Sequence, residues 1–145
     1  MSQTIDRRTF LRQLLVLGGV PSVALLHGCA VTGLTTYQVA STEGAIDLVI
    51  SEYLELQYNG GAIQLDVESV SSPIVVVRTA HDTFVALSPI CTHLGCTVRK
   101  ERSFFRCPCH GSTYALDGTV VRGPAEHSLK TFYTENDGKT LVIHL

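Results

Sequence analysis

The 145 residues suffice for one domain of ordinary size and are too few for two. The composition is 45% hydrophobic and 17% charged with a mean hydropathy of +0.22, which is apolar for a soluble domain, and much of the apolar excess lies in the first thirty residues. Beyond residue 28 the chain carries eight Lys and Arg against twelve Asp and Glu. This negative balance argues against nucleic-acid binding, which usually requires a basic face.

Residues 1–29 have the layout of an export signal. Arg7 and Arg8 precede an apolar run over 14–26, and small residues follow that run. The paired arginines followed by "TFL" resemble a twin-arginine signal, which exports proteins already folded around a cofactor. The run is thirteen residues long and therefore shorter than the eighteen or more expected of a membrane-spanning helix. We expect the rest of the chain to lie outside the cytoplasm.

Cys29 has three interpretations. "LHGC" at 26–29 resembles a bacterial lipobox, in which the cysteine receives a lipid and becomes the first mature residue, although His27 is unusual there. Alternatively, a signal peptidase cleaves after Ala30 and Cys29 is discarded. The third interpretation is an uncleaved N-terminal anchor. Lipid attachment at Cys29 is the preferred one.

From residue 37 to 145 the pattern predicts an all-β domain, preceded by a short tether over 30–36. Turn formers such as Asn59, Gly60 and the "NDG" of 136–138 separate short β-branched groups, and no group sustains helical periodicity. Only 51–56 could form a single helical turn. We expect a small antiparallel sandwich or barrel. The predicted strands are 37–40, 45–50, 62–67, 74–79, 83–87, 97–100, 103–106, 112–116, 118–121, 129–134 and 140–145.

Two loops carry most of the chemistry. "CTHLGC" at 91–96 and "CPCHGS" at 107–112 each hold two cysteines and one histidine. Two thiolates and two imidazoles could bind zinc or an iron-sulfur cluster, but a C-x-H pair fits zinc-finger spacing poorly. Zinc would also leave Cys96 and Cys109 unexplained, whereas a disulfide joining the loops would explain them in an exported protein.

Both loops resemble the Rieske iron-sulfur proteins, whose motifs are C-T-H-x-G-C and C-P-C-H-G-S. The intervening positions agree as well, and the resemblance extends over about 73–125. It implies a cluster-binding subdomain built on the loops 91–96 and 107–112 and a Rieske 2Fe-2S cofactor. The implied ligands of one iron are Cys91 and Cys107, and those of the other iron are His93 and His110. The resemblance pairs Cys96 with Cys109 in a disulfide.

This ligand set leaves an oxidised 2Fe-2S core electrically neutral, because two thiolates replace the usual four. Such centres have reduction potentials of about −150 to +300 mV. The family places hydroxyl groups at the positions of Ser112 and Tyr114, where they donate hydrogen bonds to sulfur and stabilise the reduced form. Their presence favours the upper part of that range.

Other residues receive roles only through the resemblance. Gly123 and Pro124 match the family's proline loop, 123–125, which covers the cluster, and Leu94 would lie at an exposed tip suited to docking. Four histidines outside the motifs are interpreted as incidental: His27, His81, His127 and His144. The basic residues between the loops are interpreted as a solvated hairpin surface, with docking of an acidic partner as the less favoured hypothesis; they are Arg99, Lys100, Arg102 and Arg106.

The sequence therefore predicts a one-electron carrier on the periplasmic face of a bacterial inner membrane, and no nucleophile or substrate-pocket motif indicates an enzyme acting alone. The preferred function is the iron-sulfur subunit of a quinol-oxidising complex with cytochrome b- and c-type partners. The alternative is an electron-transfer subunit or free carrier of a periplasmic oxidase such as arsenite oxidase, favoured by a Cys29-to-Tyr37 tether that reaches only about 25 Å. Cytosolic ferredoxins and oxygenase domains lack the spare cysteine pair. A zinc-binding module without redox function is the remote alternative.

Overall fold

The computed structural model describes residues 33–145, and the predicted export signal with Cys29 lies outside the described residues. Twelve strands and two short 3-10 helices follow one another in the described part. In chain order they are β1 (Thr36–Val39), β2 (Ala45–Val49), η1 (Ile50–Glu52), η2 (Leu54–Gln57), β3 (Ala62–Val67), β4 (Ile74–Ala80), β5 (Thr83–Leu87), β6 (Arg99–Lys100), β7 (Phe104–Arg106), β8 (Thr113–Ala115), β9 (Val120–Arg122), β10 (Thr131–Phe132), β11 (Thr134–Asn136) and β12 (Thr140–His144).

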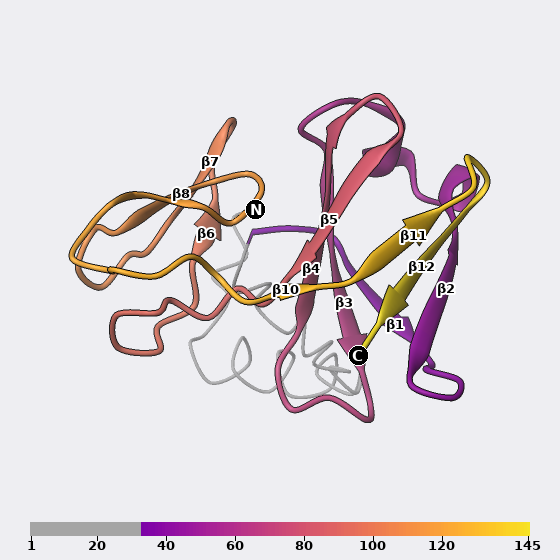
Figure 1. The fold of residues 1–145 in the computed structure, drawn as a ribbon, viewed down its shortest axis with the longest axis horizontal. Helices are drawn as coiled ribbons and strands as arrows, with labels where there is room; N and C mark the ends of the chain where they lie inside the picture. The colour runs from indigo at the N-terminus through magenta and orange to yellow at the C-terminus, as the bar shows by residue number, and fades with distance from the viewer. Residues whose placement is uncertain (1–32) are drawn as a thin grey trace, which may run out of the picture.

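The strands form three sheets, which confirms the predicted all-β class. A five-stranded sheet has the order β1-β3-β4-β5-β10, a three-stranded sheet the order β11-β12-β2, and a four-stranded sheet the order β6-β7-β8-β9. In Figure 1 the five-stranded sheet stands between the other two. The single exception to antiparallel pairing among the named strands is β1, which runs parallel to β3.

The middle sheet is buried on both faces. Ile74 and Val76 of β4 join a core shared with the three-stranded sheet, where Leu48 and Leu141 contribute. The alternate residues Val75 and Val77 join a second core shared with the four-stranded sheet. A strand buried on both faces needs apolar side chains at every position, which explains the unbroken "IVVV" of this strand. Each such side chain contributes about 1.5–3 kcal/mol when fully buried.

Two local predictions differ in detail from the structure. The segment expected to form one helical turn forms two consecutive 3-10 helices, η1 and η2, which Tyr53 separates. The segment 129–134, expected to be one strand, divides into β10 and the start of β11. The chain passes from the five-stranded to the three-stranded sheet here, and Tyr133 between the two strands is exposed.

The four-stranded sheet positions both cysteine-histidine loops. Residues 91–96 precede β6, and residues 107–112 connect β7 to β8. Phe105 and Tyr114 point from this sheet into the second core and are fully buried. The loops are thereby anchored to the middle sheet through packed aromatic side chains.

Candidate metal centre

The two loops have the same backbone hydrogen bonds. In the first, the N–H of Cys91 donates to the carbonyl of Cys96 at 2.8 Å, and the N–H of Gly95 donates to the carbonyl of Cys91 at 2.9 Å. In the second, the N–H of Cys107 donates to the carbonyl of Ser112 at 2.8 Å, and the N–H of Gly111 donates to the carbonyl of Cys107 at 3.0 Å.

Each turn therefore begins at a buried cysteine and returns through a glycine four residues later. Gly95 and Gly111 have φ values of 76° and 78°, a left-handed conformation that disfavours side chains with a Cβ atom. This equivalence aligns Cys91 with Cys107 and Cys96 with Ser112. In this alignment the two histidines occupy different positions, because His93 is two residues after its cysteine and His110 is three.

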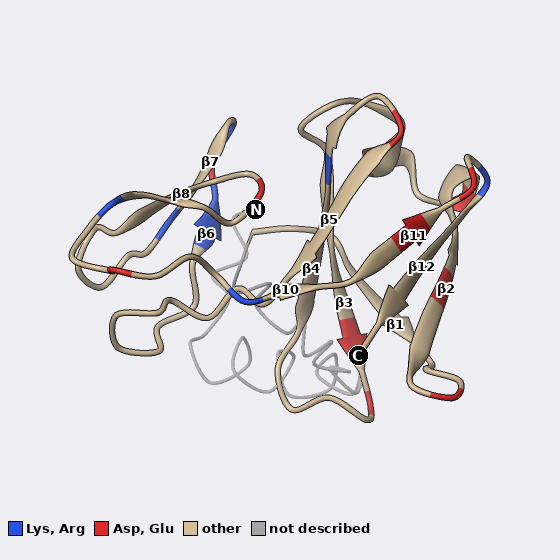
Figure 2. Ribbon diagram, in the orientation of Figure 1, with Lys and Arg blue, Asp and Glu red and all other residues tan. Residues whose placement is uncertain are grey.

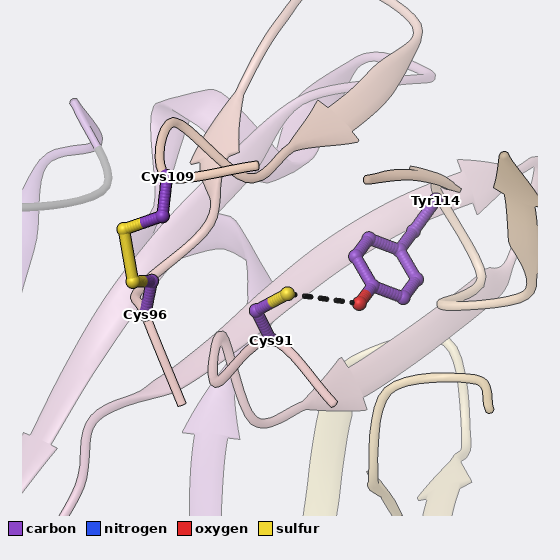
Figure 3. Close-up of a disulfide and its surroundings, with 4 residues drawn as sticks. All are labelled: Cys91, Cys96, Cys109 and Tyr114. Carbon is purple, nitrogen blue, oxygen red and sulfur yellow. Dashed lines mark hydrogen bonds between the residues drawn. A yellow bond between two sulfur atoms is a disulfide. The ribbon is translucent and has the colours of Figure 1, made fainter. Parts of the chain in front are cut away.

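A disulfide joins the loops. Cys96 and Cys109 are bonded, with their Cα atoms 6.5 Å apart and 13 positions apart in sequence. Figure 3 shows this disulfide beside Cys91. The sulfur of Cys107 lies within 4.8 Å of both disulfide sulfurs, but the bonded pair is not available to a metal. The predicted disulfide pairing is confirmed.

Two thiols and two imidazoles of the loops remain outside the disulfide. Cys91 and Cys107 are unbonded and buried. The rings of His93 and His110 meet edge to face with their centroids 4.9 Å apart. The Nδ1 atom of His93 is buried and has no hydrogen-bond partner. A buried nitrogen without a partner is costly, and coordination of a metal at Nδ1 would satisfy it. Two thiols and two imidazoles that meet in this way fit a Rieske cluster, which needs that donor set.

The hydroxyl of Tyr114 lies against the first loop. It is 3.2 Å from the sulfur of Cys91 and also accepts the N–H of Thr92 at 3.2 Å. Figure 3 shows its contact with Cys91 as a dashed line. Burial acts to raise the pKa of the Cys91 thiol, but hydrogen bonding by Tyr114, the backbone of His93 and neighbouring side chains outweighs it and lowers that pKa. Burial and the contact with Cys91 raise the pKa of Tyr114, so its hydroxyl remains a proton donor. The arrangement stabilises negative charge on sulfur.

Segment 123–127 is hydrogen-bonded to both loops. The N–H of Ala125 donates to the hydroxyl oxygen of Ser112 at 3.0 Å, which leaves the hydroxyl proton of this fully buried serine free to donate elsewhere. The hydroxyl of Thr92 donates to the backbone carbonyl of His127 at 2.6 Å. Gly123 and Pro124 are exposed on this segment and are joined by a cis peptide bond.

Thr92 is the residue whose role the sequence reasoning missed. Its backbone N–H donates to the hydroxyl of Tyr114 and its own hydroxyl donates to the carbonyl of His127, so Thr92 connects the first loop to the second loop's strand and to segment 123–127. The sequence signal for this role is the position of Thr92 inside the first motif, in which only the neighbouring Cys91 and His93 were assigned as ligands. Leu94, next to His93, is 68% exposed, as expected for a side chain at the tip.

Two of the histidines interpreted as incidental lie beside acidic side chains. His81 pairs with Asp82 at 2.8 Å, and His144 lies 3.7 Å from Glu135. Among the basic residues between the loops, Lys100 differs from the expected solvated surface because it is half-buried; its ammonium donates to the backbone carbonyls of Glu101 and Arg102, and burial lowers its pKa.

The fold and this donor set define an all-β metal-centre protein with two cross-linked ligand loops. The family model of the Rieske [2Fe-2S] domain matches residues 48–133, and the chain belongs to that family. Its cofactor is a Rieske-type 2Fe-2S cluster.

Similar proteins agree with this assignment. The chain is 54% identical over 59 residues to the chloroplastic cytochrome b6-f complex iron-sulfur subunit of Bigelowiella natans. This alignment covers 39% of this chain and 23% of that protein. The chain is 33% identical over 155 aligned positions to the cytochrome b6-f complex iron-sulfur subunit of Trichodesmium erythraeum (strain IMS101), covering 96% of this chain and 84% of that protein. Several other curated relatives are longer, and the chain spans 60% or less of their length.

A solved structure shares the fold. A chain of a hyperthermophilic respiratory complex III superposes with a TM-score of 0.51 at 24% sequence identity, covering 91% of this chain and 87% of that chain. Within residues 33–145 we find no helix with the length and apolar character needed to cross a membrane.

Proposed function

We propose that this chain is the iron-sulfur subunit of a quinol-oxidising complex and transfers single electrons from quinol to a c-type cytochrome. The buried Nδ1 of His93, left without a partner beside two free buried thiols, is the observation that carries the electron-transfer assignment. The complex is supported by the relatives, which are described as cytochrome b6-f complex iron-sulfur subunits.

The proposed ligands are Cys91 and Cys107 for one iron and His93 and His110 for the other. When bound, the cluster accepts and returns one electron at a potential that the histidine ligands raise. Cys91 and Cys107 provide thiolates from equivalent positions of the two turns, and the disulfide keeps the turns together. No other described residue competes with them for this role, because the remaining loop cysteines are bonded to each other.

Two hydroxyl groups are proposed to tune the site. Tyr114 donates to the sulfur of Cys91, and Ser112, with its proton unengaged by Ala125, donates to a bridging sulfur. Both bonds favour the reduced and more negative state. Together they are proposed to place the potential, already raised by the histidine ligands, in the upper part of the Rieske range.

The exposed tip is the proposed contact with quinol. His110 is exposed, and Leu94 presents an apolar side chain beside His93. A histidine that faces outward can release or take up a proton as the centre changes charge. Gly123 and Pro124 are proposed to cover the cluster on its other sides, so quinol would reach the cluster at this tip.

The N-terminal residues are proposed to export the chain and fix it to the membrane. Arg7 and Arg8 would direct twin-arginine export, and Cys29 would carry a lipid that holds the domain on the periplasmic face. Mass spectrometry of the protein extracted from membranes tests this: a lipidated N-terminal Cys29 is expected, and a mature chain that begins at Val31 would contradict it.

The function is tested in membranes of the native host with the gene deleted and then restored. Restoring the wild-type chain should restore quinol-dependent reduction of cytochrome c, and restoring His110→Ala should not. The matched control is His81→Ala, a histidine in the turn between β4 and β5 that pairs with Asp82, which should restore full activity. Normal quinol oxidation without the gene, together with loss of arsenite oxidation, would instead support the periplasmic oxidase as partner.

A further inference from the structure

Three arginines lie in one row across the four-stranded sheet. Arg99 of β6 is the register partner of Arg106 of β7, Arg106 is the partner of Thr113 of β8, and Thr113 is the partner of Arg122 of β9. Directly opposed residues of an antiparallel pair point to the same face. Since strands are spaced by about 4.8 Å, the row extends about 14 Å across the sheet. We call these three residues the arginine row.

The arginine row lies on the solvent face of this sheet. Arg99, Arg106 and Arg122 are exposed, whereas Phe105 and Tyr114, one position along β7 and β8, are buried on the opposite face. Arg106 immediately precedes the ligand candidate Cys107 in the chain. One member of the row is therefore adjacent in sequence to the second cluster loop.

The fold does not use these charges. No ion pair within residues 33–145 joins any of the three arginines to an acidic side chain. Like charges placed directly opposite each other in a sheet are destabilising, so the Arg99–Arg106 pair works against folding. An external anionic partner would convert this repulsion into attraction.

Charge is also segregated over the whole described molecule. Residues 88–130, which contain the loops and the four-stranded sheet, carry six Lys and Arg against three Asp and Glu. The other described residues carry two against nine. Figure 2 shows blue on β6 and red on β2, β3 and β11. Such a charge distribution orients a molecule in the field of a partner, with its basic end leading toward negative charge.

We infer that the arginine row is the docking site for an acidic patch on the redox protein that exchanges electrons with the cluster. The inference rests on the proposed electron-transfer function and adds the surface and the charge of the partner. Guanidinium groups bind carboxylates in a bidentate manner. A row of three that extends about 14 Å can contact several carboxylates on the surface of one partner protein. An anionic membrane is the less favoured occupant, because the acidic remainder of the molecule would be repelled by it.

The test is the rate of electron transfer from the reduced, cluster-loaded full chain to an acidic c-type cytochrome, followed by stopped flow. The variant Arg99→Gln/Arg106→Gln/Arg122→Gln removes the row. The matched control Arg102→Gln/Lys130→Gln/Lys139→Gln removes three positive charges elsewhere. At an ionic strength of about 0.01 M, the row variant should be about tenfold slower than wild type and the control less than about twofold slower. The wild-type rate should fall steeply toward about 0.15 M salt, and a basic c-type cytochrome should show no such dependence on the row.

Equal losses in the two variants would overturn the inference, because net charge alone would then explain the rates. A row variant that transfers electrons at the wild-type rate but no longer binds phosphatidylglycerol vesicles would also overturn it, in favour of a lipid site. The melting temperature of the row variant should equal or exceed that of wild type, and a fall of more than about 5 °C would indicate a structural role instead. The EPR signal and midpoint potential separate the two proposals: a normal cluster with row-independent rates refutes the docking site alone, and absence of the cluster refutes the proposed function.

Discussion

Removal of the disulfide between the loops should destabilise the protein by an amount that its loop length sets. Cys96 and Cys109 are 13 positions apart, and closing a loop of this size restricts the unfolded chain by about 3 kcal/mol. Cys96 is half-buried and Cys109 is exposed, so serine fits at both positions with little loss of packing. For a chain of this size, about 3 kcal/mol corresponds to a fall of roughly 10–15 °C in melting temperature.

The assay is thermal denaturation of Cys96→Ser, Cys109→Ser and the double variant, followed by far-ultraviolet circular dichroism and by visible absorbance of the cluster. All three variants break the same bond, so all three should lose the same stability rather than additive amounts. The cluster should also dissociate faster, because the two turns are then joined only through its ligands. A melting temperature within about 2 °C of wild type, or a double variant that loses twice as much as each single variant, would refute this reasoning.

Three further predictions concern the turns and the hydroxyl groups. Tyr114→Phe should lower the midpoint potential by about 40 mV, because a hydrogen bond that favours the reduced state by about 1 kcal/mol is lost; EPR-monitored redox titration measures this, and an unchanged potential would contradict it. Ser112→Ala should lower the potential by a similar amount in the same titration, while the control Ser128→Ala should leave it unchanged, and equal shifts would argue against a specific role. Gly95→Ala and Gly111→Ala should each cost about 1–2 kcal/mol in denaturant unfolding, because both turns require a positive φ, and clearly unequal costs would disprove the equivalence of the two turns.

The two loop motifs indicated where the candidate site lies, whereas the geometry around it did not follow from the sequence. The pairing of Cys96 with Cys109 followed from the resemblance of the two loop motifs to the Rieske family. Alternation and turn residues likewise predicted most strands, because local composition reflects which faces are buried. The structure confirms the all-β class and the disulfide.

Features that depend on register could not be predicted in this way. Arg99, Arg106 and Arg122 lie on three strands, and their alignment depends on turn geometry and on the bulge between β8 and β9. The parallel pairing of β1 with β3 joins segments that lie far apart along the chain. The contact of Thr92 with the carbonyl of His127 spans 35 positions and involves a backbone atom, which carries no sequence signal.

The central claim is that two thiolates and two imidazoles from these loops hold a 2Fe-2S cluster. Low-temperature EPR of the dithionite-reduced protein, with iron and zinc determined on the same sample, tests it most directly. We expect the low-average-g signal of a histidine-coordinated centre, with two irons per chain and no stoichiometric zinc. A colourless sample without that signal and with one zinc per chain would contradict the claim.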